Sequence, residues 1–229
     1  MPGAKVNDRP LINWAGFSPI RASWCCPLTA GGPPGRSGAP MGSALPPIPS
    51  VCLTGPPCTG KTTLARALAA ELGWAFVPEA ARLHAAALDR ELGFGDVEVI
   101  GRLHVELVEE ALASGARGLV LDTDLLSTEV YSQFYYARVP AWVRLLARRR
   151  RPGLYLLCRA DLPFVGEARQ RGDAREQPLL AELFEAAVLR AGAPMAWVEG
   201  TGPGRLAGAL ETVRLAGLRP AGADRHAQP

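Results

Sequence analysis

The stretch Gly55-Pro56-Pro57-Cys58-Thr59-Gly60-Lys61-Thr62-Thr63 fits the Walker A pattern G-x-x-x-x-G-K-[ST] at every position. It follows a short apolar run at 50–54 and opens a helix-like segment at 61–72. A strand, a glycine-rich turn and a helix in this order form a phosphate-binding loop, or P-loop. The stretch therefore predicts an α/β fold of the P-loop NTPase type, with a nucleotide bound beside the first strand.

Each kind of residue in the loop has a physical reason to be there. Gly55 and Gly60 let the backbone curl, so that successive N–H groups point at phosphate oxygens. The start of the helix adds a partial positive charge. Lys61 is expected to reach the β- and γ-phosphates, and the Thr62 hydroxyl to bind Mg²⁺. We therefore predict ATP and Mg²⁺ as cofactors, held by the whole of 55–63.

The use of lysine argues against a chance glycine-rich turn. The sequence has 23 arginines and only two lysines, Lys5 and Lys61. A chain this biased toward arginine has nonetheless kept a compact ammonium group at the position where a P-loop needs it. Cys58 is interpreted as a spacer whose backbone N–H binds, rather than as a reactive thiol.

Outward from the loop, short apolar runs alternate with helix-like segments. Such alternation predicts a buried parallel sheet with helices on both faces, as in nucleoside and nucleotide kinases. The charged segment 162–176 is expected to be a loop or a mobile lid. The expected strands are 50–54, 74–77, 118–122, 154–158 and 195–199, and the expected helices are 61–72, 80–92, 96–114, 124–137, 140–149, 177–191 and 204–217.

Both ends of the chain differ from its middle. Residues 1–49 contain 7 Gly and 10 Pro, which is the composition of a linker. We expect a disordered extension at 1–49, one P-loop kinase domain at 50–218 and a flexible tail at 219–229. A targeting role for the extension is the less favoured alternative to a dispensable extension or a start at Met41.

Charge and cysteine content exclude several classes of protein. The net charge is +3, but residues 50–218 carry 19 basic and 20 acidic residues, which argues against binding nucleic acid by bulk charge. No apolar run is long enough for a transmembrane helix, and no clean secretory signal is present. The five cysteines form no C-x-x-C pair, which favours the reducing cytoplasm.

Three acids follow expected strands, at the edge where open parallel sheets bind ligands. Asp122 closes an apolar strand in the manner of a Walker B carboxylate, so we expect it to hold Mg²⁺ together with Thr62. Glu79 and Asp124 are candidates for the acid that accepts a proton from an acceptor hydroxyl or orients it. The alternatives are a solvated loop acid for Glu79 and a helix N-cap for Asp124.

Arginines and an aromatic residue complete the candidate site. Arg82 lies one helical turn after Glu79 and could bind sugar hydroxyls or form a surface ion pair. Arg169 and Arg171 lie in the expected lid, where they could stabilise the migrating phosphoryl group, or could simply be a solvated basic loop. Tyr131 could stack on a base, although core packing is the default interpretation.

Beyond the P-loop, three stretches carry a family resemblance. Together with the loop they resemble the ribosylnicotinamide kinase domain of the bacterial NAD-biosynthesis regulators, a P-loop domain of the AAA type. The resemblance covers about residues 50–215. The family patterns are P-E-x-A-R, D-T-D-L-x-[ST]-T and D-x-P-W-V. They correspond here to Val77-Pro78-Glu79-Ala80-Ala81-Arg82, Leu121-Asp122-Thr123-Asp124-Leu125-Leu126-Ser127-Thr128 and Asp161-Leu162-Pro163-Phe164-Val165.

The resemblance implies an activity. It implies a kinase that uses ATP–Mg²⁺ to phosphorylate the 5′-hydroxyl of nicotinamide riboside, giving NMN in NAD biosynthesis. The sequence departs from the family at Phe164, where the family has Trp. It departs again in the next residues, which keep an acid at Glu167 but shift the arginine. Glu167 is accordingly a candidate acceptor-binding residue.

Two other functions stay open on the sequence. One is a P-loop kinase for another nucleoside or small hydroxyl compound. The other is a nucleotide-gated ATPase or switch protein, although the sequence has neither the N-K-x-D motif of GTPases nor the L-S-G-G-Q motif of transporter ATPases. The expected partners are ATP and a small nucleoside, without nucleic acid or membrane, and the oligomeric state is open.

Overall fold

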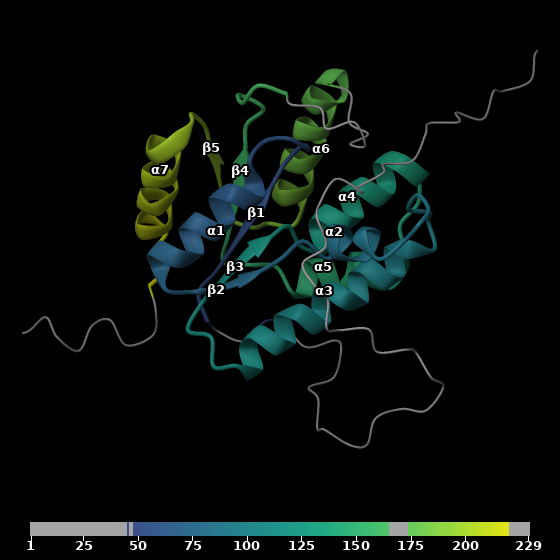
Figure 1. Cartoon of the computed structure of the whole chain (residues 1–229), viewed down its shortest axis with the longest axis horizontal. Helices are drawn as coiled ribbons and strands as arrows, with labels where there is room; N and C mark the ends of the chain where they lie inside the picture. Colours follow the sequence, from purple (N-terminus) through teal and green to yellow (C-terminus); the bar gives the residue numbers. More distant parts are fainter. Residues whose placement is uncertain (1–44, 46–47, 165–173, 220–229) are drawn as a thin grey trace, which may run out of the picture.

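Five parallel strands form one sheet in the order β2-β3-β1-β4-β5 (Figure 1). The computed structural model describes residue 45 and residues 48–164 and 174–219. The predicted α/β fold with a parallel sheet is confirmed, and the P-loop strand β1 lies at its centre. The strands are β1 (Ser50–Thr54), β2 (Ala75–Val77), β3 (Leu119–Asp122), β4 (Leu154–Cys158) and β5 (Met195–Val198).

Helices cover both faces of the sheet (Figure 1). Helices α1 (Lys61–Leu72) and α7 (Gly202–Leu215) pack on one face. On the other face pack α3 (Asp96–Ala113), α4 (Leu125–Tyr136), α5 (Ala141–Arg149) and α6 (Gln177–Arg190), and α2 (Ala80–Ala86) packs against α3. Alternate strand residues serve alternate cores: Leu119 and Leu121 pack under α3 to α6, whereas Val120 packs under α1 and α7.

The expected elements are present, most of them with ends within one residue of the prediction, and two helices differ by more. The helix expected at 80–92 ends at Ala86, because the following residues fold back onto the start of α3 through the contacts of Asp96 described below. The last helix begins at Gly202 rather than 204, with a proline in its first turn, where the missing N–H costs nothing. A short 3₁₀ helix, Ala174–Glu176, leads into α6. Most of the predicted extension 1–49 and most of the predicted lid 162–176 lie outside the described residues.

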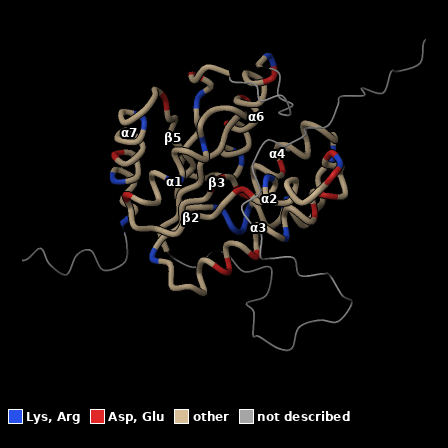
Figure 2. Tube along the Cα trace, viewed as in Figure 1, with Lys and Arg blue, Asp and Glu red and all other residues tan. Residues whose placement is uncertain are grey.

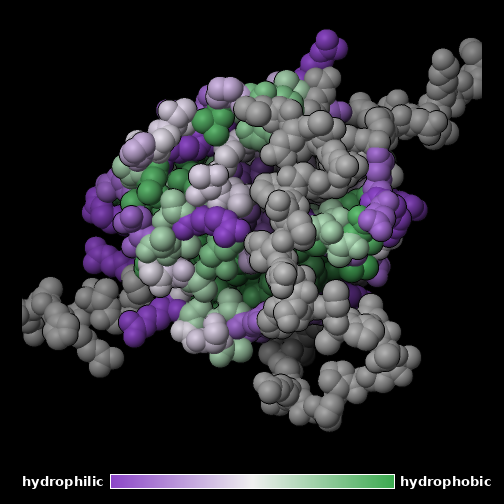
Figure 3. Space-filling model, viewed as in Figure 1, coloured by the Kyte–Doolittle hydropathy of each residue, from purple (hydrophilic) through white to green (hydrophobic). Residues whose placement is uncertain are grey.

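The surface carries charges of both signs. Lysines, arginines and acids are interspersed on the helices (Figure 2), and one face of the molecule mixes hydrophilic with hydrophobic residues (Figure 3). Among the described helices, none is both long and apolar enough to cross a membrane. Within the described part of the chain, the cysteines Cys52, Cys58 and Cys158 are free thiols.

Candidate active site

The P-loop leaves β1 and enters α1 through two glycines with left-handed backbone. Gly55 has φ of 128° and Gly60 has φ of 72°. A Cβ on Gly55 would lie 2.9 Å from the Cys158 carbonyl oxygen, so no larger residue fits without moving β4. Cys58 also has positive φ, of 61°, a conformation that costs a side-chain-bearing residue energy. The glycine positions predicted from the motif are therefore required by the local geometry.

Side chains from four helices hold the carbonyl oxygens of the P-loop. Pro56 and Pro57 carry no N–H, so the N–H groups that can bind phosphate come from the residues after them. The carbonyls of both prolines are hydrogen-bonded to side chains and anchor the loop. Because these carbonyls are held by side chains, the N–H groups of the loop are the ones expected to bind phosphate oxygens. The anchoring bonds are Tyr131 Oη to Gly55 O (3.3 Å), Lys61 Nζ to Pro56 O (2.6 Å), Gln177 Nε2 to Pro57 O (2.8 Å) and Arg205 Nη2 to Thr59 O (3.0 Å).

A cavity of about 420 Å³ lies against the loop. Its walls are 58–63, the arginine Arg66 of α1 and Arg82 of α2. Lys61 is only 9% exposed, and its ammonium group is held by a loop carbonyl. The Thr62 hydroxyl belongs to the same wall, as the motif requires. The size and the cationic walls of this cavity suit a polyphosphate.

A buried carboxylate at the end of the strand next to the P-loop strand fits a divalent cation. Asp122 ends β3, and its backbone lies in register with Leu53 of β1. The side chain is 1% exposed, and its Oδ1 atom has no hydrogen-bond partner within the described residues. A buried carboxylate oxygen without a partner is costly unless a cation balances it. No cluster of three or more His, Cys, Asp or Glu side chains among those residues could hold a metal, so Mg²⁺ at Asp122 and Thr62 would also need phosphate oxygens and water.

A second cavity lies between α2, α3 and α4. It brings together three residues that the sequence singled out, Glu79, Asp124 and Tyr131. It also contains residues that the sequence did not indicate, among them His104 and Ile100 of α3. Because side chains from three helices meet here, no local sequence pattern could have predicted the full set.

An ion pair stands where the two cavities meet. Arg82 Nη2 lies 3.3 Å from Glu79 Oε2; Arg82 lines the phosphate cavity and Glu79 lines the second cavity. Glu79 is 5% exposed, which excludes the alternative of a solvated loop acid. Burial, and next the charge of Asp122, raise the pKa of Glu79 from its ordinary 4.5 to about 7, against the opposing effect of Arg82 and Lys61.

Asp124 caps α4, which confirms the alternative considered for it. Its carboxylate accepts from the Ser127 N–H at 3.1 Å and from the Tyr155 hydroxyl at 2.6 Å. Ser127 completes a capping box with the Asp124 backbone. Burial raises the pKa of Asp124, although these hydrogen bonds oppose the shift. Contact of Asp124 with an acceptor stays a prediction.

Comparison with known proteins also indicates a P-loop domain. A family model described as AAA domain matches residues 50–205. The chain belongs to the AAA domain family. A comparison with curated proteins found no match.

Solved structures share the fold of this AAA domain. A NadR protein in complex with NR is 22% identical with a TM-score of 0.59, over 74% of this chain and 50% of that one. A NadR protein in complex with NAD and AMP-PNP is 21% identical with a TM-score of 0.57, over 75% and 50%. Thymidylate kinase from Ehrlichia chaffeensis is 12% identical with a TM-score of 0.53, over 73% and 100%. The AAA domain thus spans half the length of the NadR chains, and these comparisons confirm the expected P-loop domain of the AAA type and its fold.

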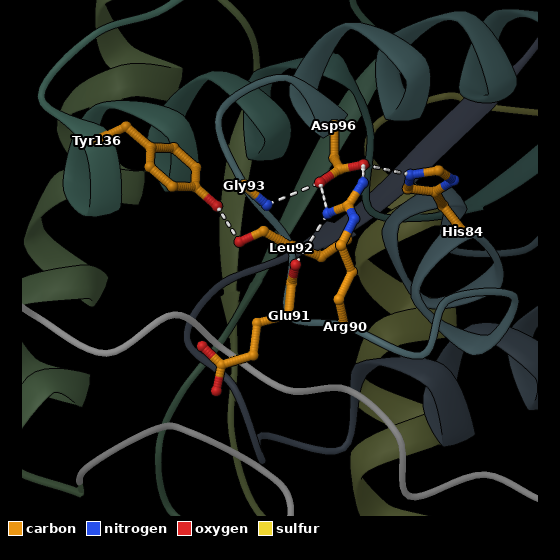
Figure 4. Close-up of polar contacts among 7 residues, drawn as sticks. All are labelled: His84, Arg90, Glu91, Leu92, Gly93, Asp96 and Tyr136. Atoms are coloured by element: carbon orange, nitrogen blue, oxygen red, sulfur yellow. Dashed lines mark hydrogen bonds and ion pairs between the residues drawn. The ribbon is translucent and has the colours of Figure 1, made fainter.

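In the AAA domain, a cluster around Asp96 fixes the segment that walls the second cavity (Figure 4). The Asp96 carboxylate accepts from Arg90 at 2.6 and 2.8 Å, from His84 Nε2 at 2.8 Å and from the Gly93 N–H at 2.7 Å. The Tyr136 hydroxyl donates to the Leu92 carbonyl at 3.0 Å. Arg90 holds the pKa of Asp96 well below its usual range. Because Leu92 and Gly93 line the cavity, this cluster sets one of its walls.

Of the remaining predicted site residues, the structure describes Tyr131 but not Arg169, Arg171 or Glu167. Tyr131 packs its ring edge-on against Phe184 and parallel to Tyr135, while lining the second cavity. It therefore has a core role, and stacking on a base stays a prediction. Arg169, Arg171 and Glu167 lie outside the described residues, so their predicted roles stay untested.

Proposed function

We propose that this AAA domain is a kinase that transfers the γ-phosphoryl group of ATP to the 5′-hydroxyl of nicotinamide riboside, giving NMN. The observation that carries the proposal is the Glu79–Arg82 ion pair, which joins a phosphate cavity to a second, aromatic cavity. A kinase needs two adjoining sites, one for the donor and one for the acceptor. A nucleotide switch needs only the first.

The phosphate cavity supplies positive charge and orientation. The proposed role of Lys61 is to exchange its bond to the Pro56 carbonyl for phosphate oxygens. Thr62 and the buried Asp122 would hold Mg²⁺, which neutralises charge on the β- and γ-phosphates when bound. Arg82 lines the same cavity, and its proposed role is to stabilise the charge of the phosphoryl group.

Glu79 is the proposed base. A general base works best when its pKa lies near the working pH, and burial has brought the pKa of Glu79 to about 7. The acceptor hydroxyl would give its proton to the Glu79 carboxylate as its oxygen forms a bond to the γ-phosphorus. The bond between that phosphorus and the β–γ bridging oxygen breaks, and ADP leaves with the electron pair.

The lining of the second cavity supports a cationic aromatic acceptor. It combines the carboxylates of Glu79 and Asp124 with the rings of Tyr131, Tyr135 and Tyr136. Carboxylates and aromatic faces both attract a positively charged ring, and nicotinamide riboside carries one. A NadR protein of the same fold was solved in complex with NR, which supports the same acceptor.

The test is a panel of nucleosides with ATP–Mg²⁺, read both as ADP release and as phosphorylated product. We expect nicotinamide riboside to be phosphorylated and Glu79→Gln to slow the transfer about 100-fold or more. Glu211→Gln, which changes an exposed acid of α7, is the matched control and should behave as wild type. ADP release that is equal with and without every nucleoside would instead support the ATPase alternative.

Two further statements belong to the proposal. The kinase domain is proposed to extend over 50–218, which includes every described strand and helix. The proposed compartment is the cytoplasm, since the described cysteines are free thiols and the reducing cytosol keeps them so.

A further inference from the structure

We propose that His104 recognises the acceptor, by hydrogen-bonding a neutral polar substituent on its ring base. The carboxamide of nicotinamide riboside is such a group. The inference rests on the proposed function, because it concerns how the proposed acceptor is selected. It assigns the selection to α3, an element that none of the predicted site residues belongs to.

The placement of His104 is the first argument. The side chain comes from the middle of α3, is 7% exposed, and lines the same cavity as Glu79 and Asp124. Its imidazole makes no hydrogen bond to any residue that the structure describes. A polar ring this deeply buried normally has a partner, because an unsatisfied donor or acceptor is costly. The cavity is where the missing partner can bind.

Three of the hydroxyl groups that line the cavity already donate to backbone carbonyls. Ser132 Oγ donates to the Arg138 carbonyl at 2.6 Å, and Thr128 Oγ1 donates to the Asp124 carbonyl at 3.2 Å. The Tyr136 hydroxyl donates to the Leu92 carbonyl. These hydroxyl groups already donate their hydrogen bonds to the protein, whereas both ring nitrogens of His104 are available to a ligand.

The protonation state of His104 sets what it can bind. Burial, and next the charge of Arg150, lower the pKa of His104 from its ordinary 6.5 to about 4, so the ring is neutral at pH 7. A neutral imidazole has one N–H donor and one lone pair. A carboxamide has a carbonyl acceptor and an N–H donor, so either tautomer of His104 makes a bond with it. An anionic substituent would be opposed by the carboxylates of Glu79 and Asp124 in the same cavity.

The test compares two acceptors in each of three proteins. The acceptors are nicotinamide riboside and N-ribosylpyridinium, which has the same cationic ring without the carboxamide. The proteins are wild type, His104→Phe, which keeps the ring volume, and His104→Gln, which keeps a donor and an acceptor. The measured quantity is the ratio of kcat/KM for the two acceptors. A partial folding defect affects both acceptors equally, so the ratio is insensitive to it.

We expect wild type to prefer nicotinamide riboside by about 10-fold to 100-fold, the usual effect of one hydrogen bond to a buried group. His104→Phe should reduce that preference to about 2-fold or less, and His104→Gln should restore part of it. An unchanged ratio in His104→Phe, or equal use of both acceptors by wild type, would overturn the role of His104 alone. No transfer to either acceptor by wild type would overturn the proposed function, and this inference with it.

Discussion

The raised pKa of Glu79 predicts that the protein loses stability as the pH rises through neutrality. In the folded protein Glu79 ionises at a pKa of about 7, against 4.5 when unfolded. The folded state therefore binds more protons between these values, and the free energy of unfolding falls as the pH increases. Integrating this difference from pH 5 to pH 8 gives a loss of about 2.5 kcal/mol, equivalent to a fall in Tm of about 5–10 °C.

The assay is urea unfolding of the nucleotide-free protein at pH 5, 6, 7 and 8, for wild type and Glu79→Gln. Glutamine does not titrate, so the difference between the two proteins isolates Glu79 from every other group. Asp122→Asn removes a charge that raises the pKa of Glu79, so in that background the loss should be smaller. Parallel stability profiles for wild type and Glu79→Gln would refute the argument that burial of this carboxyl sets its pKa.

Three further predictions concern other parts of the site. Lys61→Ala should reduce phosphoryl transfer about 100-fold to 1000-fold with an unchanged circular dichroism spectrum, since the proposed role of the lost group is to contact phosphate; near wild-type turnover would contradict this. Asp122→Asn should raise the Mg²⁺ concentration needed for half-maximal rate at least several-fold with every acceptor, measured by Mg²⁺ titration of the rate; an unchanged requirement would place the metal elsewhere. Asp96→Asn should weaken the Arg90 contact, lower stability by about 2 kcal/mol and raise the acceptor KM while the KM for ATP stays the same, because Asp96 positions a wall of the second cavity only. Equal rises in both KM values would show a general loss of structure, and Glu211→Gln is the matched control for all three.

The parts of the site that the sequence predicted are those encoded by neighbouring residues. The P-loop is contiguous, so its glycines and Lys61 follow from a single pattern. Asp122 follows from an apolar run that ends in an acid. Strand order also brought it beside β1, as the Walker B interpretation needs. The capping role of Asp124 was among the local alternatives, although its partner in the capping box, Ser127, was not identified.

Contacts between distant residues were beyond the reach of a local pattern. The helix expected to run to 92 ends at Ala86, because Asp96 draws His84, Arg90 and the Gly93 N–H together. The helical periodicity of 80–92 carries no sign of that carboxylate. Likewise, the sequence pattern around His104 predicts only a helix. The packing of α2, α3 and α4 is what places His104 in a cavity with Glu79.

The anchoring of the P-loop carbonyls by α4, α6 and α7 has a consequence for the thermodynamics of nucleotide binding. Ordering a flexible glycine-rich segment costs conformational entropy, and here that entropy is lost when the chain folds. The loop is preorganised, so the affinity for a nucleotide is not reduced by the cost of shaping its own binding site. The same bonds connect the P-loop to helices that are far apart in sequence. Opening of α6 or α7 from the sheet therefore disrupts the P-loop, and a bound nucleotide should slow hydrogen exchange in both helices.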